Sequence, residues 1–134
     1  MRITLSAIKA DVGSIGGHTM PSEKMMEVVR QEVSDAIKGG LILDGLVNHT
    51  GDDIAIIMSH TSGEGAADIH QFAWNTFLKA TDIAREYGLY GAGQDLLVDA
   101  PSGNVRGAGP GVAEIEFEHT LSGHRPAESF MVFA

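Results

Sequence analysis

The chain has 134 residues and no cysteine, which excludes disulfides, thiolate metal ligands and cysteine nucleophiles. Eighteen acidic residues against nine basic ones give a net charge of −9, which disfavours nucleic acid and anionic lipid as partners and suits cations. The length predicts a single α/β domain over residues 1–134. Neither a signal-peptide core nor a membrane-spanning apolar run is visible, so we expect a cytoplasmic protein outside the membrane.

The chain opens with a predicted strand and a predicted helix. Polarity alternates over residues 2–10, which is typical of a strand. Its buried face would carry Ile3, Leu5 and Ala7. Ser22 is a favourable N-cap, and apolar residues then recur at helical spacing until Gly39 and Gly40 end the helix.

A hairpin is predicted next. The apolar, β-prone runs Leu41–His49 and Ile54–His60 are separated by a short connection. Asp52 and Asp53 would lie at the tip of this hairpin.

A second, longer helix is predicted from Ala66 to Tyr87, with Gly88 as a natural residue just beyond its end. Its aromatic residues fall at helical spacing, so we expect them in the core. These are Phe72, Trp74 and Phe77.

The last part of the chain predicts a loop followed by strands. Residues 99–111 hold glycines and prolines that interrupt regular structure. Val112–Glu118 alternates as a strand whose glutamates, Glu114, Glu116 and Glu118, would form a solvated face. The apolar run Ser129–Ala134 also reads as a strand, and we expect the chain to be the N-terminal portion of a longer one.

This order of elements predicts an α+β fold, the ferredoxin-like split βαβ sandwich, with two helices on one face of a mainly antiparallel sheet. The crossover rule makes the first two strands parallel, so Asp11 and the pair Asp52 and Asp53 should emerge at one sheet edge. A fourth strand parallel to the third would bring Tyr90 and Gln94 close to the same edge.

The convergence of Asp11, Asp52 and Asp53, with His18 on the following loop, predicts a cation site. Clustered carboxylates are costly unless a cation or a proton neutralises them. Oxygen ligands with an occasional imidazole suit Mg²⁺ or Mn²⁺, and adjacent aspartates can serve two ions. The alternative is that Asp52 and Asp53 form an ordinary solvated turn.

Other segments carry weaker indications of function. The glycine-rich loop at residues 102–111 could cradle a phosphate through its amides, or be an ordinary surface loop. The histidines have no paired metal-ligand spacing, so we expect them to be solvated or satisfied within the core. They are His49, His60 and His70.

Several segments of the sequence resemble the archaeal and bacterial fructose-1,6-bisphosphate aldolase/phosphatase family, whose members are bifunctional enzymes of gluconeogenesis. Four groups of segments match in order and spacing. They are Ile8–Ser14 with His18, His49–Asp53, Leu89–Leu97, and Ser102–Gly107 with Gly109–Glu114.

The resemblance implies metal-binding roles by matching position. Asp11 would be a Mg²⁺ ligand and the proton acceptor of the phosphatase step, and His18 would bind the same ion and touch substrate. Asp52 would bridge two ions, Asp53 would bind the second ion, and Gln94 would be a further ligand. Two or more Mg²⁺ ions are implied, with Mn²⁺ as a possible substitute.

The resemblance also implies substrate contacts and an assembly. Tyr90 would reach a sugar bisphosphate bound in a neighbouring subunit, and the backbone at Gly103 and Asn104 would hold a substrate phosphate. The family condenses two triose phosphates through a lysine Schiff base and then removes the 1-phosphate. Its fold is a layered α-β-β-α assembly, usually a homo-octamer.

One departure from the family limits this expectation. The Schiff-base lysine, its tyrosine and an Asp-Lys pair come later in family members and have no match here, so we expect this chain alone to be inactive or incomplete. Two other classes remain open: a non-catalytic ferredoxin-like module that binds a small metabolite, and a structural subunit that assembles through its final strand.

Overall fold

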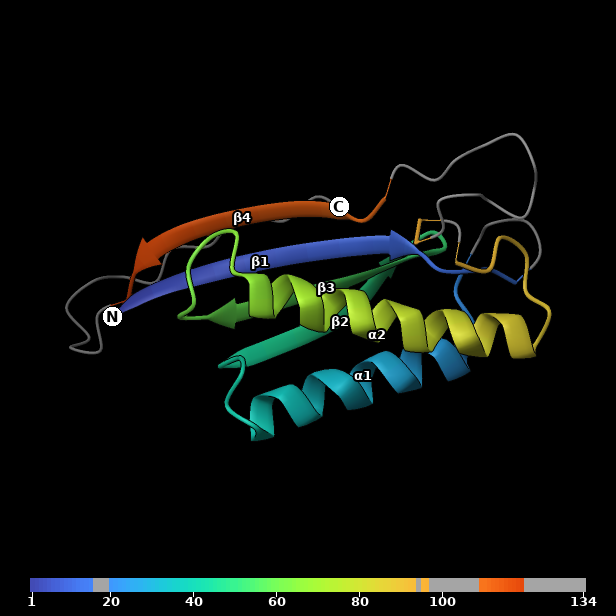
Figure 1. The fold of residues 1–134 in the computed structure, drawn as a ribbon, viewed down its shortest axis with the longest axis horizontal. Coiled ribbons are helices and arrows are strands. Elements are labelled where there is room, and N and C mark those ends of the chain that lie inside the picture. Colours follow the sequence, from blue (N-terminus) through green and yellow to red (C-terminus); the bar gives the residue numbers. More distant parts are fainter. Residues whose placement is uncertain (16–19, 94, 97–108, 120–134) are drawn as a thin grey trace.

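The computed structural model describes residues 1–15, 20–93, 95–96 and 109–119. The elements are β1 (Arg2–Asp11), α1 (Glu23–Lys38), β2 (Asp44–Thr50), β3 (Asp53–His60), α2 (Ala67–Glu86) and β4 (Gly111–Glu118). The sheet order is β2-β3-β1-β4, with every neighbouring pair antiparallel, and the two helices lie along one face (Figure 1). The predicted ferredoxin-like α+β fold is therefore confirmed, and the predicted strand at 129–134 lies outside the described residues.

The helices begin and end close to the predicted signals. The Ser22 hydroxyl accepts the Met25 N–H at 3.2 Å and caps α1, and Gly39 follows its last residue. Gly88, with φ +63°, follows α2 and its C-cap Tyr87. The capping residues thus account for three of the four helix ends, since the N-cap of α2, Ala66, makes no side-chain cap.

The hairpin is confirmed, but its first strand begins at Asp44 rather than at Leu41. Leu41 N–H donates to the Ala36 carbonyl at 3.0 Å, and Ile42 is buried in the core. The apolar residues before Asp44 therefore bury the connection from α1 instead of extending the strand.

A hydrophobic core fills the space between the helices and the sheet. It contains Met25, Met26, Val29, Val33 and Ala36 of α1, Ile69, Ala73, Phe77, Ala80 and Ala84 of α2, and Ile8, Ala10, Ile54, Ile56 and Met58 of the sheet. Burial of such apolar surface is the main stabilising contribution to a domain of this size.

The face of β1 that packs on the helices differs from the prediction. Ile8 and Ala10 belong to the core, whereas Ile3 and Ala7 are buried on the opposite face of the strand. Both faces of β1 carry buried apolar residues, and alternation alone does not say which face meets the helices.

The orientation of β4 is also the reverse of the prediction. Glu114 pairs with Ser6 across the sheet on the helix side, and its carboxylate accepts hydrogen bonds from Ser6, from the Gly65 N–H and from His70. Ile115 points to the other face and is 52% exposed. The glutamate face is therefore not a solvated one, because protein donors replace water around Glu114.

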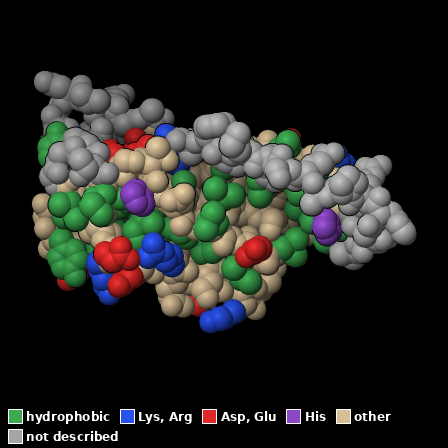
Figure 2. Space-filling view, turned by 180° about the vertical axis from the view of Figure 1, so that it is seen from behind, with side chains coloured by type: hydrophobic (Ala, Val, Ile, Leu, Met, Phe, Trp, Pro, Cys, Tyr) green, Lys and Arg blue, Asp and Glu red, His purple; other side chains and the backbone are tan. Residues whose placement is uncertain are grey.

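The sheet face turned away from the helices is apolar. Figure 2, which views the molecule from behind, shows hydrophobic side chains across the middle of this side. Leu46 on β2 and Ile115 on β4 both expose more than half of their surface there, at 58% and 52%.

Within the part of the chain that is described, neither helix has the length and apolarity needed to cross a membrane.

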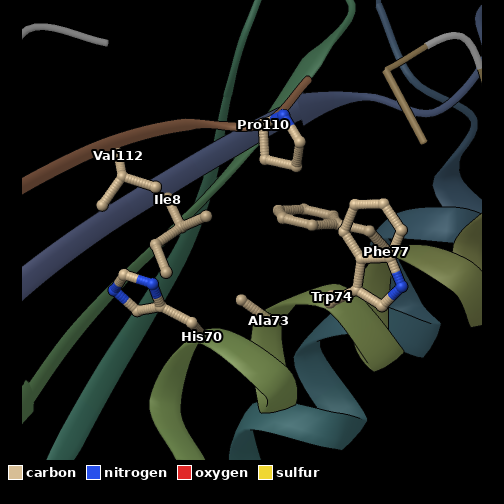
Figure 3. Close-up of a pocket in the computed structure, with 7 residues that line it drawn as sticks. All are labelled: Ile8, His70, Ala73, Trp74, Phe77, Pro110 and Val112. Atoms are coloured by element: carbon tan, nitrogen blue, oxygen red, sulfur yellow. The ribbon is translucent and has the colours of Figure 1, made fainter. Parts of the chain in front are cut away.

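The aromatic residues of α2 are divided between the core and the surface. Phe77 is fully buried as predicted, but Trp74 is 37% exposed, which corrects the expectation of a core position. Trp74 and Phe77 lie opposite Pro110 in a pocket of about 190 Å³ between α2 and the start of β4 (Figure 3). Trp74 therefore lines an open hollow rather than the interior.

Candidate metal centre

Three carboxylates converge where β1 ends and β3 begins. Asp11 is the last residue of β1 and pairs with Asp53, the first residue of β3, while Asp52 belongs to the tight turn before it. One carboxylate oxygen from each of the three lies within 4.8 Å of the others. Oxygens around one Mg²⁺ are separated by about 3–4 Å, given Mg–O bonds of about 2.0–2.1 Å, so small side-chain movements would allow all three to share an ion. The predicted convergence is confirmed.

Local backbone geometry produces this arrangement. The hairpin turns through only Gly51 and Asp52, and Gly51 has φ +59°, a conformation that glycine adopts without strain. The short turn keeps Asp52 beside Asp53 and sets both against the end of β1. The solvated-turn alternative was right about the turn, but the turn is not isolated from Asp11.

The electrostatics of Asp11 reflect this crowding. Burial, then the charge of Asp52, and to a lesser extent those of Asp53 and Asp95, raise the pKa of Asp11 to about 6, although the Gly13 N–H donates to its carboxylate at 3.2 Å and opposes the rise. A carboxylate held in this way favours a proton or a cation beside it.

Lys9 is a member of the cluster that sequence reasoning missed. Its Nζ lies 3.1 Å from Asp53 Oδ2, and both side chains are partly exposed. Lys9 and Asp11 are two residues apart and so share one face of β1, opposite Asp53 on the neighbouring strand. That spacing is a signal that could have identified the ion pair.

The segment after α2 runs along the end of β1. Ser14 and Tyr90 exchange two backbone hydrogen bonds of 3.0 and 3.1 Å, and the Gly93 N–H donates to the Val12 carbonyl at 2.9 Å. The expectation that Tyr90 lies near this sheet edge is confirmed, and its side chain is 56% exposed.

The approach of this segment requires a glycine at position 13. Gly13 has φ +137°, and a Cβ there would lie 2.7 Å from the Ala84 Cβ and 3.4 Å from the Ala92 Cα. Any side chain would therefore collide with α2 at Ala84 and press on the following segment at Ala92.

Asp95 is a further residue that sequence reasoning missed. Its Oδ2 accepts the Asp11 N–H at 2.7 Å, and its own N–H donates to the Asp11 carbonyl at 3.1 Å. Burial raises the pKa of Asp95, and the bond from the Asp11 N–H opposes that rise. These contacts join residues 84 positions apart, so no local sequence pattern predicts them.

Four of the predicted site residues cannot be placed. His18, Gln94, Gly103 and Asn104 lie outside the described residues, as does most of the predicted phosphate-binding loop.

The remaining histidines follow the expectation of solvated or satisfied side chains. His60 is buried, with Nε2 2.7 Å from the Ser6 hydroxyl, and His70 lies 3.0 Å from Glu114. The exposed His49 contacts the Gly51 carbonyl through Nδ1 at 2.9 Å.

Comparison with known proteins gives a consistent result. Proteins named fructose-1,6-bisphosphate aldolase/phosphatase from Cenarchaeum symbiosum, Thermus thermophilus and Pyrobaculum neutrophilum are 54%, 53% and 52% identical to this chain. Each match covers the whole of this chain but only 34%, 35% and 33% of the relative, so the chain spans about a third of the length of these curated relatives. The family model described as fructose-1,6-bisphosphatase matches residues 2–134. With the acidic cluster and this near-complete match, the chain belongs to the fructose-1,6-bisphosphatase family.

Proposed function

We propose that this chain supplies the metal-binding end of a Mg²⁺-dependent fructose-1,6-bisphosphate phosphatase, within a protein that also condenses dihydroxyacetone phosphate with glyceraldehyde 3-phosphate. The observation that carries the proposal is the convergence of Asp11, Asp52 and Asp53 in a member of this family. Three close carboxylates and no thiolate suit a hard divalent cation.

The residues present fit such a centre. Asp11, His18 and Asp52 would hold one ion, Asp52 and Asp53 would hold a second, and Gln94 would be a further ligand. When bound, Mg²⁺ would neutralise phosphate charge and polarise the P–O bonds, and Mn²⁺ could substitute for it.

Asp11 would act as the proton acceptor in phosphate removal. Its carboxylate would take a proton from a water molecule as the water oxygen attacks the 1-phosphorus. The bond between phosphorus and the sugar oxygen breaks, and that oxygen takes a proton from solvent. The products are fructose 6-phosphate and inorganic phosphate.

Substrate contacts would come from residues around this edge and from a neighbouring subunit. His18 and the backbone at Gly103 and Asn104 would bind sugar phosphate. Tyr90 has its backbone fixed by Ser14 and its side chain more than half exposed, which suits a reach into a neighbouring subunit. We therefore propose a cytoplasmic homo-oligomer.

Two exposed apolar side chains on the sheet face turned away from the helices support the layered part of this proposal. Leu46 and Ile115 would be covered if a second sheet packed there, as in an α-β-β-α arrangement. Aldol condensation needs a Schiff-base lysine that this chain does not match, so the activity requires the complete gene product.

The proposal is tested on the complete gene product by phosphate release from fructose 1,6-bisphosphate. We expect release with Mg²⁺, none after chelation, and a severe loss in Asp11→Asn. Asp82→Asn makes the same charge change on the exposed surface of α2 and should leave the rate unchanged. Metal-independent binding of a metabolite, without phosphate release and indifferent to Asp11→Ala, would instead identify a non-catalytic module.

A further inference from the structure

We propose that Asp95 is a positioning residue that holds the backbone of Asp11, so that the Asp11 carboxylate is presented to the cluster. This inference rests on the proposed metal-dependent function. It assigns Asp95 a role as an acceptor for a backbone N–H, and not as a metal ligand.

Such a residue is needed because β4 does not pair with the last residues of β1. Pairing between β1 and β4 ends at Lys9 and Gly111, two residues before Asp11. Beyond that point Asp95 makes two hydrogen bonds to the backbone of Asp11. Its Oδ2 accepts the Asp11 N–H at 2.7 Å, and its own N–H donates to the Asp11 carbonyl at 3.1 Å. Asp95 thus holds the last residue of β1 where the edge strand no longer does.

Asp95 is itself held in place. The Gly93 N–H donates to the Val12 carbonyl at 2.9 Å, and the Leu96 N–H donates to the Gly93 carbonyl at 3.0 Å. Leu96 is buried in the hydrophobic core. A residue fixed between a backbone hydrogen bond and a buried anchor can orient another group accurately.

The geometry separates Asp95 from the carboxylates that could bind an ion. Among the described residues, the group whose oxygens lie within 4.8 Å of one another consists of Asp11, Asp52 and Asp53. Asp95 directs Oδ2 to the Asp11 N–H instead. Its negative charge adds to an already crowded cluster, so the hydrogen bonds, and not the charge, explain its position.

Two substitutions distinguish positioning from ligation. Asp95→Asn keeps an oxygen that can accept the Asp11 N–H but removes the charge, whereas Asp95→Ala removes the acceptor. Asp44→Ala is the matched control, because Asp44 also accepts a backbone N–H, that of Gly45 at 2.8 Å, at the opposite end of the hairpin.

The measurements are Mn²⁺ affinity without substrate and amide hydrogen exchange at Asp11 in chelator, both on the complete gene product. For Asp95→Ala we expect Mn²⁺ affinity weaker by about 10–100-fold, the effect typical of losing a partner that orients a ligand. Exchange at Asp11 should be faster by about tenfold, corresponding to one lost hydrogen bond. Asp95→Asn should keep the exchange rate of the unaltered protein and lose less Mn²⁺ affinity than Asp95→Ala, and Asp44→Ala should change neither.

Two results would overturn the inference. Equal loss of Mn²⁺ affinity in Asp95→Asn and Asp95→Ala would show that the charge of Asp95, and not its hydrogen bond, supports the cluster. Unchanged exchange at Asp11 in Asp95→Ala would show that Asp95 does not hold the backbone, whatever the metal result. Failure of the unaltered protein to bind Mn²⁺ would instead contradict the proposed function, while the exchange measurement would still decide the role of Asp95.

Discussion

Two partly buried carboxylates of the sheet, Glu114 on β4 and Asp11 at the end of β1, have opposite surroundings. Burial disfavours the charge of Glu114, but hydrogen bonds from Ser6, Gly65 and His70 outweigh it and lower the pKa of Glu114. Burial acts in the same direction on Asp11, where the next largest influence is the charge of Asp52, and the pKa of Asp11 rises to about 6.

A structural carboxylate and a functional one differ in the groups that surround them. At Glu114 the protein provides the donors that the ionised group needs, so the group completes the fold. At Asp11 the described residues gather other carboxylates, an arrangement that favours a proton or a cation beside the group. Both groups are partly buried acids in the same sheet, and only their neighbours separate the two roles.

Asp52→Asn, within the cluster of Asp11, Asp52 and Asp53, should have the largest effect. Loss of a ligand proposed to serve two ions should lower phosphate release at least about 100-fold, at the upper limit of the losses seen for groups that merely orient a ligand. In chelator, the same variant should melt at a higher temperature than the unaltered protein, because one of the like charges beside Asp11 is gone. A phosphate-release assay with Mg²⁺ checks the first effect and scanning calorimetry in chelator checks the second, where a lower melting temperature would contradict the like-charge explanation.

Glu114→Gln should have the opposite pattern. The substitution replaces one of the two carboxylate oxygens by an NH₂ donor, so either Ser6 or the pair Gly65 N–H and His70 loses its acceptor, and the free energy of unfolding should fall by about 1–3 kcal/mol. Mn²⁺ affinity should be unchanged. Urea unfolding measures the loss, with Glu118→Gln at an exposed position of the same strand as the control. Weaker Mn²⁺ binding in Glu114→Gln would show that the two regions are coupled.

The smallest predicted effect is a pH dependence at His60, next to Glu114. The Ser62 N–H donates to Nδ1, so the neutral ring carries its proton on Nε2 and donates to the Ser6 hydroxyl. Burial lowers the pKa of His60 below its ordinary 6.5, against the raising influence of Glu114 and Asp68. The neutral form is therefore favoured by folding, and its contribution to stability is complete above pH 6.5 and is lost as the pH falls through the lowered pKa.

The stability difference between the unaltered protein and His60→Gln measures that contribution. It should be largest above pH 6.5 and shrink towards pH 5. Nitrogen-15 NMR of the ring should show the Nε2–H tautomer at neutral pH. A difference that grows as the pH falls would mean that the charged ring is the stabilised form.

Sequence patterns predicted the fold where local chemistry decides the structure. Ser22, the glycines after α1 and Gly88 mark helix ends through hydrogen bonds or φ values that depend on nearby residues only. The three aspartates were predicted together because the topology follows from the order of elements.

Prediction failed where the answer depends on distant partners. Alternation along β4 identifies two faces but not which one meets α2, because the donors to Glu114 lie on β1, the loop before α2 and α2 itself. Asp95 and Asp11 meet only because the segment after α2 returns to the end of β1. The sequence pattern around each of them is that of an ordinary loop or strand end.

The position of β1 in the sheet has a consequence for how the chain is made. β1 is synthesised first but lies between β3 and β4, and its first residue, Arg2, pairs with Glu118. Ribosomes add about 5–20 residues per second, so Asp95 emerges roughly 4–17 s after Asp11, from which it is separated by 84 positions. During that interval β3 can pair with β1 and bring the three aspartates together, while the other edge of β1 is still open to pairing with another chain. The three aspartates can therefore come together before the Asp95 contact forms and before β4 closes the sheet.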